Sequence, residues 1–433
     1  MVNYYSPDSI VFMIDGCEAN CSSCGTRKNT GRELTSKVMK NYIDQAALLG
    51  MKKVKFSGGE PLSRRYGDVL ECIGHATFKG LKTHVMSNAS YANSEDATLK
   101  KVDELKASGL GSICLSFDEP HLEYIPKSNH ARMTKAALKK GLEVGIQAIV
   151  TKSSEGRNIS LLNDLAESIG GKLEAKYMNI GKEKVKIEDY IMVGDEKVKV
   201  WLMDMERAGN AKLLPRKDFV YSPQGRLKCK SNGTSILSTQ TVVIQSDDIK
   251  PCCSFQALNN DFYKMGDTGK TSLVQATENT NESILGPIVL GPEAIRRARN
   301  SLRKSQKPEL VKIAKKRYQI GCDACQSFLT NKCSRDFLLE EFEKNTSANP
   351  QIVFDEKDVA SEETANIIVD GKKIRFLDYV GPVDDLYRKC IVHNRERLKK
   401  MDKDGKLSNT IEIYDKTLGI FDGPNNIKVP TSN

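Results

Sequence analysis

The sequence lacks any apolar run long enough to cross a membrane. A transmembrane helix needs about 20 consecutive, mostly apolar residues, and no stretch of the 433-residue chain has this composition. Residues 1–15 also lack the basic segment, the apolar core and the small-residue cleavage site of a secretion signal. The sequence therefore predicts a cytoplasmic protein that has no membrane as a partner.

Aromatic residues are also scarce. They make up 6% of the chain, and Trp201 is its single tryptophan. Proteins that recognise single-stranded nucleic acid stack the bases on clustered aromatic side chains, and no aromatic-rich RNA-binding motif occurs in this sequence. Nucleic acid is therefore not expected as a partner.

Positive charge is concentrated in one segment. The chain has a net charge of +10, and residues 291–317 hold ten Lys or Arg and two Glu. Pro292 is a favourable first residue for a helix in this segment. The basic segment is interpreted either as a solvated helix face or as a docking surface for an acidic partner.

Cysteine, in contrast, is abundant, with twelve residues in the chain. In a long sequence without a secretion signal, cysteines indicate metal or thiol chemistry rather than a disulfide framework. Cys72 and Cys114 stand alone in apolar patterns and are interpreted as small core residues. Most of the others form three groups: Cys17, Cys21 and Cys24; Cys229, Cys252 and Cys253; Cys322, Cys325 and Cys333.

Short β-branched runs alternate with helical patterns over residues 9–182. In one helical pattern Val38, Tyr42 and Ala46 share a face, and Gly50 ends the helix. Six strand–helix repeats imply parallel strands joined by right-handed crossovers. The predicted fold class is therefore α/β, as a Rossmann-like sheet or as a complete or partial barrel.

The regular alternation fades after residue 185. Residues 220–340 contain six cysteines and many polar residues, which is typical of a small domain held together by metal. Residues 343–433 are interpreted as an α+β appendage, in which Asp370 and Gly371 predict a hairpin turn. We therefore predict three domains, at residues 1–185, 186–342 and 343–433, the last being a candidate for substrate docking.

Three cysteines follow the first predicted strand within eight residues, as Cys17, Cys21 and Cys24. A zinc site would need a fourth ligand close by, yet residues 25–71 contain no Cys and no His. A disulfide between two of these three cysteines would leave the third as a free thiol. A four-iron, four-sulfur cube held by three thiolates leaves one iron open to a substrate or cofactor, and the flanking glycines let the backbone wrap such a cluster.

The second predicted strand ends in Phe-Ser-Gly-Gly-Glu. Gly58 and Gly59 allow the backbone to approach a ligand closely, and Glu60 adds a carboxylate at the same rim. Together with the three cysteines, this stretch resembles the radical S-adenosylmethionine (SAM) superfamily over residues 9–182. The resemblance implies a partial (β/α)6 TIM-like barrel, followed by a small cysteine-rich auxiliary-cluster domain and the C-terminal α+β appendage.

In that family a [4Fe-4S] cluster on the three thiolates chelates SAM through its open iron. The reduced cluster passes one electron to SAM, and the resulting 5′-deoxyadenosyl radical takes a hydrogen atom from the substrate. The resemblance implies that the Gly58–Glu60 stretch contacts the methionine part of SAM. It also implies further residues of the SAM pocket at the same rim, which are Ser87, Asn88, Ser116 and Lys127, with Arg132 as the alternative to Lys127.

One position departs from the family pattern. Ser23 stands where the family usually has an aromatic residue, directly before the third cysteine. In the family that aromatic side chain packs near the adenine of SAM. The resemblance therefore does not identify the residue that packs there in this chain.

A second set of thiols resembles the shortened auxiliary-cluster domain, called twitch, that follows the barrel in some members. The set comprises Cys229, Cys252, Cys322 and Cys325. The resemblance implies an auxiliary [4Fe-4S] cluster that relays electrons, whereas a zinc ribbon on the same four residues is the alternative. The longer SPASM form would need more closely spaced cysteines. Cys253 and Cys333 are then spare, either as catalytic hydrogen donors or as ordinary thiols.

The resemblance implies an enzyme that abstracts hydrogen from an unactivated carbon of a peptide or protein, giving a crosslink, an epimerisation or an oxidation. The auxiliary domain, the basic segment and the C-terminal region favour a peptide substrate. An electron donor such as flavodoxin or ferredoxin is expected as a partner. The alternatives are the same chemistry on a small molecule such as an amino sugar (a dehydrogenase or epimerase), a nucleic-acid-modifying enzyme, and a non-catalytic iron–sulfur protein.

Overall fold

The structure is a computed structural model of the 433-residue chain. It contains two compact units, which we name the sheet unit (Pro7–Tyr221 with Gln240–Asn279) and the helical unit (Met1–Ser6, Ser222–Thr239 and Thr280–Asn433). The residues that the structure describes are 7–25, 33–151, 153–180, 183–219, 241–283, 285, 294–316, 318, 321–347, 352–354, 366–369, 372–375 and 396.

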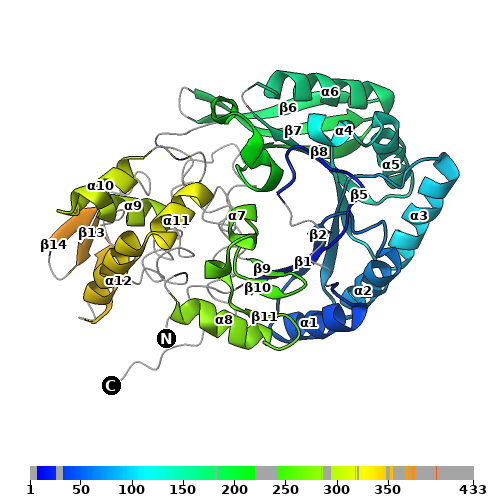
Figure 1. The fold of residues 1–433 in the computed structure, drawn as a ribbon. Coiled ribbons are helices and arrows are strands. Elements are labelled where there is room, and N and C mark those ends of the chain that lie inside the picture. Colours follow the sequence, from blue (N-terminus) through cyan, green and yellow to red (C-terminus); the bar gives the residue numbers. More distant parts are fainter. Residues whose placement is uncertain are drawn as a thin grey trace. The chain divides into compact units, whose positions relative to one another are not determined.

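Five parallel strands form the centre of the sheet unit, in chain order (Figure 1). Their side chains alternate between two faces, as the pleat of a strand requires. Phe12 and Phe56 lie opposite each other in the ladder, and their rings stack with centroids 5.7 Å apart. The strands are β1 (Ser9–Ile14), β2 (Lys53–Gly58), β3 (Lys82–Ser87), β4 (Ser112–Ser116) and β5 (Glu143–Val150). The predicted α/β class with parallel strands is confirmed.

Helices follow these strands and lie along the outer side of the curved sheet (Figure 1). Helix α1 shows why they form: Thr35 caps it by accepting a hydrogen bond from the Val38 amide, and Met39 and Ile43 are fully buried on one face. The chain leaves this helix through Gly50, whose φ of 71° suits glycine. The helices are α1 (Ser36–Leu48), α2 (Tyr66–Phe78), α3 (Glu95–Ala107), α4 (Glu119–Leu122), α5 (Lys127–Lys139) and α6 (Glu155–Ser168).

The sixth strand of the parallel series differs from the expectation. Strand β6 (Lys172–Ile180) lies at the edge of the sheet and pairs antiparallel with β7 (Glu183–Val193). The parallel neighbour of β5 is instead β8 (Glu196–Asp204), because β7 and β8 form a hairpin across Gly194, whose φ is 59°. Strand β7 runs through residue 185, where a domain boundary was predicted.

Three later strands extend the other end of the same sheet. Strand β9 (Thr241–Ile244) is parallel to β1, and β10 (Asp248–Lys250) and β11 (Gly266–Asp267) continue antiparallel. The short helix α7 (Phe255–Leu258) lies between β10 and β11 in the chain, and α8 (Leu273–Glu282) follows β11. Most of residues 278–283 belong to α8, in which Thr280 is fully buried.

The helical unit is described by itself. It contains the helices α9 (Ala294–Lys304), α10 (Pro308–Lys315), α11 (Gly321–Thr330) and α12 (Lys332–Ser347), and the strands β12 (Ile352–Phe354), β13 (Asn366–Val369) and β14 (Lys372–Arg375). Strands β13 and β14 pair antiparallel from Val369 and Lys372 outward, so the predicted hairpin is confirmed. Beyond residue 375, the described part of the chain contains only the helical Glu396.

The basic segment is only in part a charged surface. It forms two helices, α9 and α10, and Arg297 and Arg299 are 3% and 5% exposed. The Arg299 guanidinium donates to the carbonyls of Ala314 and Lys316, at 2.8 and 3.2 Å, and so caps the C-terminal end of α10. These two arginines therefore act inside the unit. The exposed bases are Arg303, Lys304, Lys307, Lys312, Lys315 and Lys316. Among the described residues, no helix is both long and apolar enough to span a membrane.

Candidate functional site

The three N-terminal cysteines lie in the loop that leaves the carboxyl end of β1. The amide of Cys24 donates to the carbonyl of Cys21 at 3.1 Å, which closes a tight turn. Burial and, to a smaller extent, the charges of Cys17 and Cys24 raise the pKa of the Cys21 thiol to about 12. Burial also raises the pKa of Cys17. Cys17 and Cys21 are therefore protonated thiols, which must release their protons when they bind metal.

Two asparagines from distant parts of the sequence hold this cysteine loop. Asn210 donates its side-chain amide to the carbonyl of Cys21 and its backbone amide to that of Cys24, both at 2.9 Å. Asn259 donates its side-chain amide to the carbonyl of Gly25 at 2.9 Å. Sequence reasoning did not identify either residue, because bonds between segments so far apart leave no local pattern.

An aromatic ring also packs on the cysteine loop. A Cβ placed on Gly25 would lie 2.3 Å from the ring of Phe255, so the glycine is required for this close approach. Phe255 also packs against the apolar cluster of Val11, Val243 and Leu258. Ser23 stands where the family pattern has an aromatic residue. Phe255 of α7 therefore supplies an aromatic side chain that packs on the loop to which Ser23 belongs.

A single zinc ion and an iron–sulfur cluster would need different spacings of the three thiols. Within the described residues, no three Cys, His, Asp or Glu side chains are close enough to bind one metal ion together. Three thiolates on one zinc ion would each lie about 2.3 Å from it, so their sulfur atoms would be close neighbours. In a [4Fe-4S] cube each thiolate binds a different iron, and the sulfur atoms stand farther apart.

The Gly-Gly-Glu stretch packs directly against the start of the cysteine loop. The amide of Gly59 donates to the carbonyl of Ile14 at 2.7 Å, and the amide of Glu60 donates to that of Gly16 at 2.8 Å. A Cβ on Gly59 would lie 2.0 Å from the carbonyl oxygen of Gly16. The ends of β1 and β2 therefore touch backbone to backbone, which only glycine permits here.

Gly59→Ala should separate these two strand ends. We expect a loss of about 1–3 kcal/mol in the free energy of unfolding, because the new methyl group meets backbone that cannot rotate away. Gly67→Ala is the matched control: it lies in α2 with no atom within 4 Å of the new Cβ, and it should stabilise by about 0.4–1 kcal/mol. Denaturant titration of both variants measures the difference, and equal stabilities would contradict the close approach.

The carboxylate of Glu60 joins the ends of β2 and β3. It accepts hydrogen bonds from the Ser87 hydroxyl at 3.0 and 3.1 Å, from the Asn88 amide at 2.6 Å and from the Leu62 amide at 3.0 Å. Burial raises the pKa of Glu60 to about 7, although these bonds favour the charged form. Its oxygens therefore accept hydrogen bonds from within the protein, and the contact of the Gly58–Glu60 stretch with the methionine part of SAM stays a prediction.

Asn88 connects this carboxylate to the cysteine loop. Its side-chain amide donates to the sulfur of Cys17 at 3.4 Å, while its backbone amide donates to Glu60. The next residue, Ala89, has a φ of 60°, a left-handed conformation that is uncommon for residues other than glycine. The structure thus brings Cys17, Glu60, Ser87 and Asn88 together at one end of the sheet, as the sequence predicted.

The remaining residues predicted for the SAM pocket have other contacts. Lys127 is half exposed at the start of α5, and its ammonium group pairs with Asp164 of α6 at 2.7 Å. Arg132 donates to the carbonyl of Ala92 at 2.8 Å. Ser116 is half-buried at the end of β4, at the same rim as Ser87. The roles predicted for Ser116 and Lys127 in binding SAM stay predictions.

The second set of cysteines is described only in part. Cys252 is buried and accepts a hydrogen bond from the Ser254 amide at 3.4 Å. Cys325 is buried on α11 of the helical unit. Cys229 lies outside the described residues, as does the side chain of Cys322. Because Cys252 and Cys325 belong to units described separately, the auxiliary cluster stays a prediction.

The two spare thiols have different surroundings. Cys253 is exposed. Burial lowers the pKa of Lys55 on β2, and the charge of a Cys253 thiolate opposes this shift. Cys333 is exposed on α12 of the helical unit. Cys253 therefore lies near a strand that ends at the cysteine loop, and the role of either thiol as a hydrogen donor stays a prediction.

Comparisons with known proteins agree with this geometry. Residues 11–152 match the protein family described as the Radical SAM superfamily. The chain is 26% identical over 166 residues to the probable GTP 3′,8-cyclase of Methanosarcina acetivorans, across 36% of this chain and 46% of that protein. It is 32% identical over 104 residues to the PqqA peptide cyclase of Bradyrhizobium diazoefficiens, across 23% and 26%. The chain thus spans less than half of the length of these relatives.

A solved structure of Streptococcus suis SuiB is also similar to this chain. The two share 18% sequence identity with a TM-score of 0.40, and the match covers 63% of this chain and 65% of SuiB.

Proposed function

Since the chain contains a radical SAM domain at residues 11–152, we propose that it is an enzyme that abstracts a hydrogen atom from an unactivated carbon of a peptide or protein. Cys17, Cys21 and Cys24 would bind a [4Fe-4S] cluster. Gly58, Gly59 and Asn88 would line the SAM site beside it. When bound, the cluster and SAM supply the 5′-deoxyadenosyl radical.

The observation that carries this proposal is the anchored loop that holds three thiols. Asn210 and Asn259 fix its backbone, and Asn88 donates to the sulfur of Cys17. Donors to a cluster sulfur tune its electronic properties and orient it. The protein's part is therefore to hold the thiols, to orient the ligand along the strand ends and to exclude water.

A peptide substrate is supported by one relative whose name states it, the PqqA peptide cyclase. The exposed bases of α9 and α10 would suit an acidic peptide. A flavodoxin or ferredoxin would supply the electron. Cys229, Cys252, Cys322 and Cys325 would hold an auxiliary cluster, and Cys253 or Cys333 would return a hydrogen atom to the substrate if the product is an epimer.

A small-molecule substrate is the second candidate. The match to the GTP 3′,8-cyclase covers 166 residues, more than the 104 residues matched to the peptide cyclase. These matches cover 36% and 23% of this chain, which says little about the substrate. A peptide encoded beside this gene that changes mass only with SAM and reductant present would decide for the first candidate.

The test of the proposed activity uses the full chain reconstituted with iron and sulfide. With dithionite and SAM, we expect 5′-deoxyadenosine and methionine to form, measured by liquid chromatography and mass spectrometry. Omitting dithionite is the control, because cleavage needs one electron. Intact clusters that produce no 5′-deoxyadenosine would refute both substrate candidates together.

A further inference from the structure

A buried carboxylate and a histidine form a pair directly beyond the end of β4. Asp118 is completely buried, and one of its oxygens lies 2.6 Å from Nδ1 of His121. The other oxygen accepts a hydrogen bond from the Ile149 amide of β5 at 3.0 Å. A buried carboxylate must be paired or hydrogen-bonded to be tolerated, and both oxygens of Asp118 are used in this way.

The histidine keeps one ring nitrogen available. With Nδ1 donating to Asp118, Nε2 carries a lone pair when the ring is neutral. Among the described residues, none is recorded as a hydrogen-bond partner of Nε2, and the His121 side chain is 20% exposed. Asp118 therefore fixes the tautomer of the His121 ring, and Nε2 of that ring is left as a basic nitrogen.

The pair lies at the same end of the sheet as the cysteine loop. Burial would lower the pKa of His121, but the charge of Asp118, the hydrogen bond to it and the charge of Glu60 raise it above its ordinary value. The charge of Asp118 also contributes to the raised pKa of Cys21. Burial lowers the pKa of His130 to about 4, so His130 is uncharged at neutral pH and does not repel a protonated His121. Among the described residues, the titratable groups whose charges act on His121 are Asp118, Glu60 and His130.

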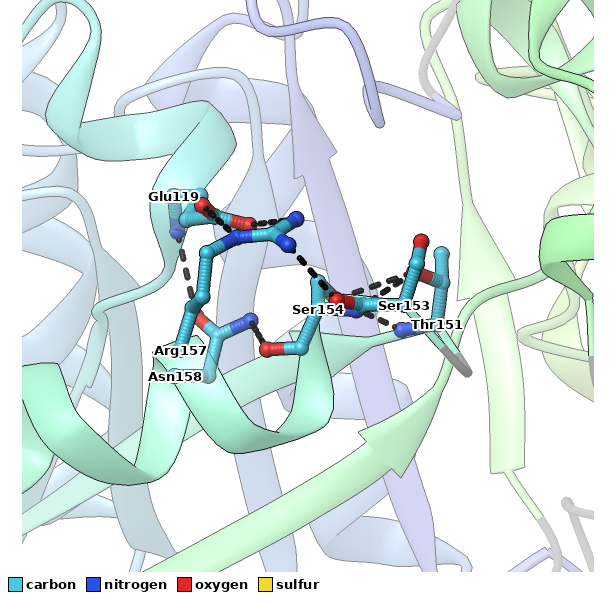
Figure 2. A network of polar contacts seen from close by, with 6 residues as sticks. All are labelled: Glu119, Thr151, Ser153, Ser154, Arg157 and Asn158. Carbon is cyan, nitrogen blue, oxygen red and sulfur yellow. Dashed lines mark hydrogen bonds and ion pairs between the residues drawn. The ribbon is translucent and has the colours of Figure 1, made fainter.

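Figure 2 shows how the segment that carries the pair is held. The Glu119 amide donates to the side chain of Asn158 at 3.1 Å, and the Glu119 carboxylate pairs with Arg157 of α6. Asn158 and Arg157 in turn donate to the carbonyls of Ser154 and Ser153, at 3.0 and 2.7 Å. The exposed ion pair contributes little alone, but the backbone bonds fix α4, and with it His121, against the start of α6.

We propose that His121, positioned by Asp118, accepts a proton from the substrate after hydrogen abstraction; this inference rests on the proposed function. Hydrogen abstraction itself needs no base, whereas an N–H or O–H beside the radical carbon must lose its proton before many products can form. In this step the N–H or O–H bond breaks, its electron pair stays on the nitrogen or oxygen, and the proton goes to Nε2. No electron leaves the substrate in the same step, so no oxidant is consumed. Asp118 stabilises the imidazolium that results.

The test measures the open nitrogen directly, in protein labelled with 15N at its five histidines. In the NMR titration we expect His121 to titrate above pH 6.5 with the proton of the neutral ring on Nδ1. Asp118→Asn should lower that pKa, because it removes the neighbouring charge. The matched control is Asp44→Asn. It removes the carboxylate oxygen that lies 2.9 Å from Nε2 of His75 on α2, and it should leave the pKa of His121 unchanged.

A second measurement does not depend on any variant folding. Diethyl pyrocarbonate acylates accessible neutral imidazoles, so it should modify His121 in the wild-type reconstituted protein, at a rate that follows its titration. A His121 that is unreactive, or that titrates at or below pH 6.5, would refute the proton-transfer role even when SAM is cleaved. Absence of SAM cleavage with a normal His121 would instead refute the proposed function, so the two failures are distinguishable.

Discussion

Replacing Cys17, Cys21 or Cys24 singly with Ala should reduce SAM cleavage to the level measured without protein. A cube held by three thiolates has no ligand to spare, and a variant with two would expose a second iron and lose the cluster. The iron bound at this site should fall with the activity. Iron content and 5′-deoxyadenosine, measured on the same reconstituted sample, check this prediction.

Cys72→Ala is the matched control for the cysteine variants. Cys72 is fully buried in α2, where burial raises the pKa of its thiol to about 12 and its sulfur contacts the carbonyl of Ser36 at 3.8 Å. Removing its sulfur should cost stability by leaving a small cavity and should leave iron content and SAM cleavage intact. Full activity in Cys17→Ala, or its loss in Cys72→Ala alone, would contradict the assignment of the cluster ligands.

Glu60→Gln should remove a large part of the pH dependence of stability. The folded-state pKa of Glu60, about 7, lies above the value of 4.5 expected for an unfolded chain. Its contribution to stability is therefore fully present below about pH 4.5 and is lost as the pH rises through 7. By linkage, the stability difference between wild type and variant should shrink by about 2–3 kcal/mol between pH 5 and pH 8.

Glu60→Gln should also lower the free energy of unfolding by an amount that does not depend on pH. A glutamine amide keeps one accepting oxygen but places its NH2 group where the other oxygen accepted from the amide of Asn88 or of Leu62, and a donor left facing a donor costs about 1–3 kcal/mol at every pH. Denaturant titrations from pH 5 to pH 8 separate the two effects. Glu167→Gln, at an exposed position of α6, is the control and should keep the wild-type slope; the same slope in Glu60→Gln would contradict the buried carboxylate.

The order of β1 to β5 could be predicted from the sequence because its signals are local. Each strand is a short β-branched run, and helices such as α1 carry their own cap and stop, at Thr35 and Gly50. The place of β6 could not be predicted this way. Its pattern is that of a strand, but its neighbours are decided by the hairpin at Gly194, which puts β8 beside β5.

The residues of the candidate site also differ in whether the sequence alone identifies them. Cys17, Cys21 and Cys24 are recognisable because their ligand chemistry depends on short spacing along the chain. Asn210 and Asn259 hold the same loop from a distance through single side-chain bonds, and such bonds leave no periodicity to detect. The burial of Arg299 is a further case, since the carbonyls of Ala314 and Lys316 that accept its bonds become its neighbours only in the folded chain.

The central claim is that three thiolates leave one iron open to SAM. Electron–nuclear double resonance of the reduced, reconstituted protein with SAM carrying 15N in its amino group tests it most directly. The account predicts a hyperfine coupling between the label and the cluster that is absent in Cys17→Ala. A reduced cluster on Cys17, Cys21 and Cys24 that shows no coupling to the labelled SAM would contradict it.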